Sequence, residues 1–92
     1  MDERALWARR VAAALRSGGT LPAALDAARD ATDSFELAGP LGFLAERARG
    51  GSTLAAAMAE LPEVFTEAEV AAIAAAEATG ELASGLESLG GS

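Results

Sequence analysis

The sequence has 92 residues and a net charge of −7, and a chain of this length has room for one small domain with a single hydrophobic core. It contains no cysteine and no histidine, which excludes disulfide bonds, thiol nucleophiles, Cys/His zinc clusters and histidine general bases. All seven basic residues precede Gly50, so the second half cannot supply the phosphate contacts that nucleic-acid binding requires.

The first two predicted helices are separated by a pair of glycines. Apolar residues recur every three or four positions over residues 6–15, which is the pattern of an amphipathic helix. Gly18-Gly19 ends this helix, and Thr20 then offers a side-chain oxygen as the N-cap of the second. A proline two positions later fits in the first turn, where its missing N–H costs nothing. We expect the second helix to fray near residues 32–33.

The third predicted helix contains a proline. Ser34 is its expected N-cap, and its apolar periodicity continues until Gly50-Gly51. Gly39-Pro40 lies inside this segment, and Pro40 removes one internal hydrogen bond. We therefore expect a kink or a restart of the helix at this point.

A short fourth helix and the start of a fifth follow. Ser52 or Thr53 is the expected N-cap of the fourth helix, which Pro62 terminates. Thr66 and Glu69 have the spacing of a capping box, in which the hydroxyl and the carboxylate each satisfy an otherwise unpaired backbone N–H. The capping box predicts that the fifth helix begins directly after Thr66.

The fifth helix is long and rich in alanine. We expect Val70, Ile73 and Ala74 to face inward, and Gly80 to supply the left-handed conformation that ends the helix. A sixth helix is predicted over residues 81–89, with three leucines on one stripe.

One sequence pattern recurs three times along the chain. In each instance a helix ends at glycine, and the next helix begins with a leucine that is followed four positions later by another apolar residue. The instances are Gly19 with Leu21 and Leu25, Gly51 with Leu54 and Met58, and Gly80 with Leu82 and Leu86. Such turns build αα-hairpins. The sequence therefore predicts an all-α fold, a compact bundle of six short antiparallel helices in three helical hairpins. We assign residues 1–89 to a single helical domain and residues 90–92 to a flexible tail or a cloning remnant.

Composition supports the all-α prediction. Hydrophobic residues make up 51% of the chain but aromatic residues only 4%, because alanine, the best helix former, is unusually abundant. The longest apolar run, residues 70–76, is far shorter than the ~20 residues needed to cross a bilayer, so we expect the chain to be soluble. Trp7, the single tryptophan, is expected in the core, and Phe65 is expected to plug the bundle as a hydrophobic staple does.

Three stretches of the chain carry blocks that go beyond helical periodicity. Residues 7–25 lead from an aromatic and a basic residue into a Gly-x-x-Leu-x-x-Ala-Leu turn, and residues 50–65 contain a glycine, a cap, a leucine and Pro-x-x-Phe. Residues 75–89 are similar to a Gly-Glu-x-Ser-Gly-x-Leu signature, with Ala76 in place of its usual glycine and Thr79 in place of a usual serine. Together these blocks resemble the cytoplasmic domain of the type II secretion F protein and type IV pilus platform protein family.

The resemblance implies a location and a function. Such domains lie on the cytoplasmic face of the bacterial inner membrane, as parts of a platform protein for type II secretion or type IV pilus assembly. The implied function is that of a non-catalytic scaffold domain, not an enzyme, that docks the cytoplasmic assembly ATPase and other inner-membrane subunits. A homodimer is implied as well, with membrane contact only through segments outside this chain. The alternative is a free-standing acidic helical adaptor that binds a basic protein partner.

The candidate interaction residues are acidic. Seven acidic residues follow Gly50 with no basic residue among them. This negatively charged half of the chain would attract a basic protein surface. We single out Glu67, Glu69, Glu77 and Glu81. For Glu67 and Glu69 the alternative is capping, because negative charge is favourable at the start of a helix.

Glu77 has two interpretations, because a carboxylate among small apolar residues needs a partner. It can accept hydrogen bonds from a neighbouring turn or pair with an arginine such as Arg9 or Arg10. The resemblance gives the other interpretation, since some family domains dimerise with calcium at the interface, which makes Glu77 a candidate calcium ligand. Calcium needs six to eight oxygen atoms, so Glu77 alone cannot form such a site. No other cofactor is implied.

Overall fold

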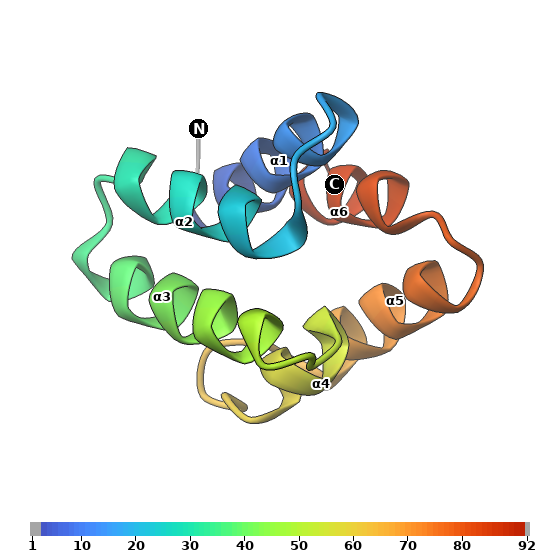
Figure 1. Cartoon of the computed structure of the whole chain (residues 1–92). Helices are drawn as coiled ribbons and strands as arrows, with labels where there is room; N and C mark the ends of the chain where they lie inside the picture. The colour runs from blue at the N-terminus through green and yellow to red at the C-terminus, as the bar shows by residue number, and fades with distance from the viewer. Residues whose placement is uncertain (1–2, 92) are drawn as a thin grey trace.

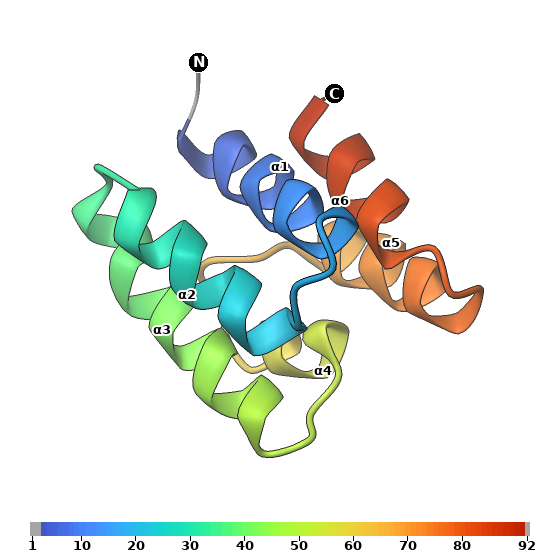
Figure 2. The same ribbon diagram turned by 45° about the horizontal axis from the view of Figure 1, so that its top comes forward.

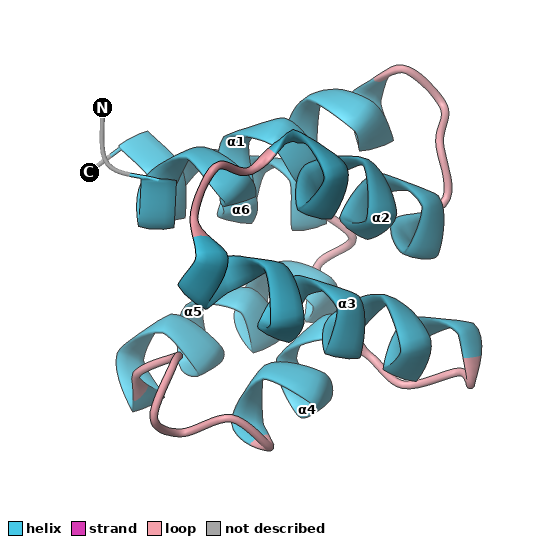
Figure 3. Cartoon of the chain, turned by 90° about the vertical axis from the view of Figure 1, so that its left-hand side faces the viewer, coloured by secondary structure: helices cyan, strands magenta, loops and turns pink. Residues whose placement is uncertain are grey.

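Six α-helices make up the part of the chain that the computed structural model describes, residues 3–91 (Figure 1). They are α1 (Glu3–Arg16), α2 (Leu21–Ala31), α3 (Phe35–Arg49), α4 (Leu54–Ala59), α5 (Glu67–Ala78) and α6 (Leu82–Gly91). Over the same residues there is no β-strand, and short loops join the helices (Figure 3). The predicted all-α fold class and the number of helices are confirmed.

The N-termini of four helices are set by hydroxyl side chains. Thr20, Ser34, Thr53 and Thr66 each accept a hydrogen bond from the backbone N–H three residues on, at 3.1–3.4 Å. Each of these bonds satisfies one of the donors that a helix leaves unpaired in its first turn. Of the two candidates for the cap of α4, the structure uses Thr53.

The helices α1, α3 and α5 end in the same way. Gly18, Gly51 and Gly80 have φ angles of +95°, +97° and +74°, a conformation that side-chain-bearing residues rarely adopt. In each turn the N–H after the glycine donates back to a carbonyl of the last helical turn, with N–O distances of 2.8–3.0 Å. These are Schellman motifs, and they confirm the three predicted glycine turns. In the first turn the left-handed residue is Gly18, not Gly19.

The helices follow one another around a closed ring (Figure 1). Each predicted hairpin pairs its two helices, and the ring adds contacts between hairpins: α2 packs against α3, α4 against α5, and α6 against α1. Figure 2 shows α1 and α6 side by side, so the first and last helices of the chain close the ring.

The core fills the middle of the ring and is entirely apolar among the residues whose side chains are described. Every helix contributes to it. The largest fully buried side chains are Val11, Leu25, Leu41, Leu44, Leu54, Met58, Ile73 and Leu86. Trp7 is buried, as predicted, and its ring meets the ring of Phe65 edge-on at a centroid distance of 5.7 Å. Phe65 therefore joins the α4–α5 loop to α1.

Of the kink or restart predicted for the third helix at Gly39-Pro40, the restart is wrong. Helix α3 runs unbroken through Pro40. The carbonyl that loses its donor there belongs to Glu36, which is exposed and can be hydrated instead. Leu41 and Leu44 are fully buried after the proline, so core packing stabilises the helical conformation there.

The predicted inward face of the fifth helix is only partly correct. Ile73 is fully buried and Val70 is half-buried, but Ala74 is exposed. Alanine occupies most positions of α5 on every side, so the apolar pattern does not single out one face.

Helix α6 extends beyond its predicted end at Leu89 and includes Gly90 and Gly91; Ser92 of the predicted tail lies outside the described residues. Gly90 is buried against α1, where a Cβ atom would lie 2.6 Å from the carbonyl oxygen of Ala5. On the other side of α6, a Cβ on Gly85 would lie 2.4 Å from the Cβ of Ala76. The two glycines thus let α6 lie close to both of its neighbours.

Two glycine-to-alanine substitutions in α3 and its C-terminal turn should have opposite effects on stability. Gly51→Ala should lower the free energy of unfolding by about 1–2 kcal/mol, because Gly51 has a positive φ angle. Gly42→Ala should raise it by about 0.5–1 kcal/mol, because Gly42 lies inside α3 and an added Cβ would make only ordinary contacts with Arg29. Urea denaturation followed by circular dichroism measures both. Equal effects of the two substitutions would contradict this account of the glycine turn.

Candidate functional site

The four carboxylates predicted to mediate interaction lie on α5 or directly after it. Glu67 is exposed in the first turn, Glu69 is half-buried two residues on, and Glu77 is half-buried in the last turn. Glu81 is exposed between Gly80 and the start of α6. The four are therefore distributed along the whole helix, about 18 Å for its 12 residues, rather than gathered at one point.

The carboxylate of Glu77 binds the N-terminus of α4. Its Oε2 accepts a hydrogen bond from the backbone N–H of Leu54 at 2.8 Å, and its Oε1 accepts one from the N–H of Ala55 at 3.1 Å. Thr53 accepts from the next N–H, that of Ala56, at 3.2 Å. Side chains thus satisfy the first three donors of α4, and the negative charge of Glu77 faces the positive end of the helix.

These bonds bear directly on the two interpretations of Glu77. The first interpretation is that Glu77 accepts hydrogen bonds from a neighbouring turn. The structure has these bonds, and both carboxylate oxygen atoms of Glu77 accept one. Within residues 3–91, no three acidic side chains lie close enough together to hold a metal ion. The assignment of Glu77 as a calcium ligand stays a prediction, in which a second chain would have to contribute further oxygen atoms.

Glu69 also serves a helix end. Its Oε1 accepts a hydrogen bond from the N–H of Thr66 at 2.8 Å, while the Thr66 hydroxyl accepts from the N–H of Glu69 at 3.1 Å. The predicted capping box is confirmed. A partner that used the Glu69 carboxylate would therefore compete with the start of α5.

Arginines of the first half of the chain reach two carboxylates of the second half. Arg47 pairs with Glu60, and Arg16 pairs with Glu87. The seven acidic residues after Gly50 are unopposed in the sequence, but the fold pairs these two and uses Glu69 and Glu77 as caps. Three acidic residues of this half have no ion pair or hydrogen bond of their side chains within the described part of the chain. They are Glu63, Glu67 and Glu81.

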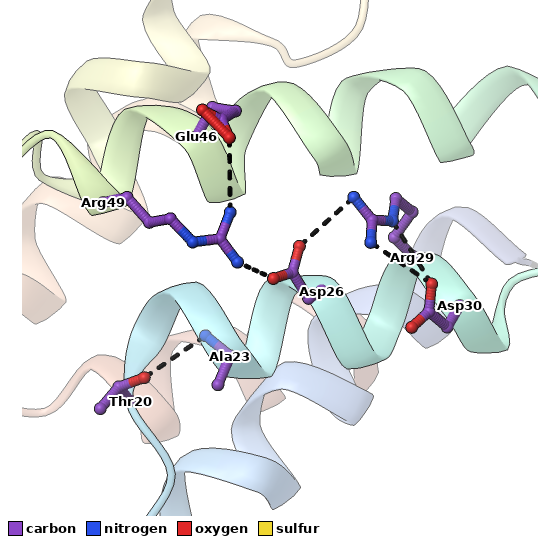
Figure 4. A network of polar contacts seen from close by, with 7 residues as sticks. All are labelled: Thr20, Ala23, Asp26, Arg29, Asp30, Glu46 and Arg49. Atoms are coloured by element: carbon purple, nitrogen blue, oxygen red, sulfur yellow. Dashed lines mark hydrogen bonds and ion pairs between the residues drawn. The ribbon is translucent and has the colours of Figure 1, made fainter.

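The remaining arginines of α2 and α3 are engaged with nearby carboxylates (Figure 4). Asp26 accepts a hydrogen bond from Arg49 and forms an ion pair with Arg29 at 3.4 Å, and Arg29 also lies 3.4 Å from Asp30. Arg49 reaches Glu46 as well, at 3.6 Å. The network ties α2 to α3 at the surface, where each pair contributes little alone.

A groove lies beside the first half of α5. Its volume is about 390 Å³, and it is lined by Ala59, Pro62, Phe65, Glu67, Val70 and Ala71. Phe65, at the position before the N-cap, and Val70, four residues into α5, both line it, which is the arrangement expected of a hydrophobic staple. The sequence predicts the staple. It does not predict the groove, because the end of α4 and the loop that follows it also form part of the groove wall.

The fold and these contacts agree with a comparison by sequence. Residues 7–91, which include most of α1 and all of the other helices, match the profile of the family described as Type II secretion system (T2SS), protein F. The chain belongs to the type II secretion system protein F family. A comparison with curated proteins gave no match. The resemblance seen in the three sequence blocks is thereby confirmed.

In this F-family domain, no helix within residues 3–91 is both long enough and apolar enough to cross a bilayer. The family block over residues 75–89 contains the Glu77 cap and the Gly80 turn. Two of its residues therefore have structural roles that hold α4, α5 and α6 together.

Substitution of Glu77 should destabilise the F-family domain. Glu77→Ala should lower the free energy of unfolding by about 2 kcal/mol, because two donors at the start of α4 lose a charged acceptor. Glu77→Gln should cost about half as much, since the amide oxygen can accept from only one of the two N–H groups. Thermal and urea denaturation measure both.

The matched control is Glu63→Ala, which removes an exposed carboxylate with no partner in the described chain. It should change the free energy of unfolding by less than about 0.5 kcal/mol. If Glu77→Ala behaved like Glu63→Ala, the cap would have no energetic role.

Proposed function

We propose that this chain is a non-catalytic scaffold domain of an inner-membrane platform protein in a type II secretion or type IV pilus assembly machine. In this proposal it lies on the cytoplasmic face of the inner membrane and docks the cytoplasmic assembly ATPase and other subunits of the machine. The observation that carries the proposal is the family match, which spans residues 7–91. It favours a machine subunit over the alternative of a free-standing acidic adaptor.

The uses of the carboxylates support a scaffold. Glu69 caps the start of α5, Glu77 joins α5 to the start of α4, and Glu60 and Glu87 pair with arginines from the other half of the chain. These roles fix the shape of the ring. Glu63, Glu67 and Glu81 are exposed, so their charge is available to a protein partner.

The test is deletion of residues 7–91 from the gene that encodes the platform protein. Secretion or pilus assembly should be lost in cells, and binding of the purified 92-residue chain to the assembly ATPase or another machine subunit should be measurable by calorimetry. Normal secretion and pilus assembly after the deletion, with no binding to any subunit, would contradict the proposal.

We further propose a homodimer, following the family resemblance. Light scattering should give a mass near twice 9.2 kDa at high protein concentration. A mass that stays at the monomer value over the whole concentration range would remove this part of the proposal.

A further inference from the structure

The helix caps and ion pairs leave the groove beside α5 unexplained. Apolar groups form most of its wall, and its volume of about 390 Å³ is within the range of about 300–1,000 Å³ in which proteins bind ligands and side chains. Phe65 forms part of the wall and is itself packed against Trp7, so the groove has a fixed floor.

The charge at the groove has one sign. Glu67 is the only charged residue of its lining, and Glu63 lies in the loop that borders it. Neither carboxylate has a partner within residues 3–91, whereas the nearby Glu60 is already paired with Arg47. A partner with basic side chains at the rim would therefore meet carboxylates that are still free to pair.

The surface continues from the groove along α5. Ala71, Ala75 and Ala78 are exposed at spacings of four and three residues, so they share one face of the helix. A second, shallower groove of about 300 Å³ follows between α5 and α6, and its lining includes Ala75 and Glu81. Small side chains on this face allow another helix to approach closely, and an exposed carboxylate stands at each end of the path.

We infer that this face of α5 docks an amphipathic helix of another protein, whose large apolar side chains enter the groove and whose basic side chains face Glu67 and Glu81. The two carboxylates lie at opposite ends of α5, which is about 18 Å long, so the basic residues of the partner lie about three turns apart. The inference adds a binding surface to the proposed function. It rests on that proposal in one respect, that the partner is a subunit of the same machine.

The charge of this face of α5 favours a basic helix of another protein over a second copy of the chain. Two copies packed through α5 would place Glu67 opposite Glu67 or Glu81 of the other copy, according to the relative direction of the helices. Either arrangement brings like charges together in a contact between low-polarity surfaces, which is unfavourable. A homodimer would therefore use another face.

The probe is an 18-residue helical peptide with leucines on one face and lysines on the other, without tryptophan, and its control carries glutamates in place of the lysines. Binding is followed by Trp7 fluorescence and by amide NMR shifts of the 92-residue chain. The lysine peptide should bind and shift residues 67–81, and the glutamate peptide should bind at least tenfold more weakly. Affinity for the lysine peptide should also fall with added salt.

Two matched pairs of variants separate docking from non-specific attraction. Glu67→Lys should weaken binding about tenfold, whereas Glu36→Lys should change it less than twofold. Both residues are exposed, unpaired and in the first turn of a helix, and each change moves the net charge from −7 to −5. Ala71→Gln should block the groove and weaken binding about tenfold, with Ala27→Gln, another exposed helical position, as its control.

Several results would overturn the inference. These are equal weakening by Glu67→Lys and Glu36→Lys, NMR shifts outside residues 59–85, no binding of either peptide at millimolar concentration, or a dimer that Ala71→Gln dissociates. If machine subunits bound all four variants equally, the proposed scaffold function would stand and this surface would not be the one used. If the lysine peptide bound as expected but no machine subunit did, the surface would stand and the scaffold function would fail.

Discussion

The fold depends on one carboxylate that joins two helices. Helix α4 has six residues, too few to be stable alone in water, because a helix must first offset the cost of its nucleation. Glu77 of α5 accepts hydrogen bonds from the first two N–H groups of α4, and Thr53 accepts from the third. The start of α4 is thus satisfied largely by another helix. Without that acceptor, the helix that places Leu54 and Met58 in the core would be stabilised less, by about 2 kcal/mol.

The use of carboxylates as helix caps also determines which charges remain on the surface of α5. Because Glu69 and Glu77 are committed to helix ends, the outward face of α5 keeps its charge only at Glu67 and Glu81, with alanines between them. Phe65 lies at the base of the groove because its ring is held by Trp7 of α1. The groove is therefore fixed by contacts on its inner side, while its outer side stays open to a partner.

The sequence predicts well what is decided within a few residues. The hydroxyl caps, the Thr66–Glu69 capping box and the glycine turns are local, and all are present. It could not tell which groups Glu77 binds, since Leu54 lies 23 positions away and only the packing of α4 on α5 brings them together. The sequence also cannot place Ala74, which is exposed, because alanine fits either face of a helix. The sequence does not show that α3 continues through Pro40, because this depends on buried leucines on both sides of the proline, whose packing outweighs one lost hydrogen bond. The groove was not predictable for the same reason as the Glu77 cap, since its walls come from α4, the loop and α5.

The pairing of α1 with α6 also determines when the domain can be completed. Among the six helices α1 is synthesised first, yet the helix that lies against it, α6, is synthesised after the other five. Until then α1 lacks one of the two helices that pack against it in the closed ring. Contacts between the two ends of a chain form only after the entropy cost of closing the longest loop has been met. The arrival of Gly85 and Gly90 is therefore the event that converts a partly covered chain of helices into a closed core.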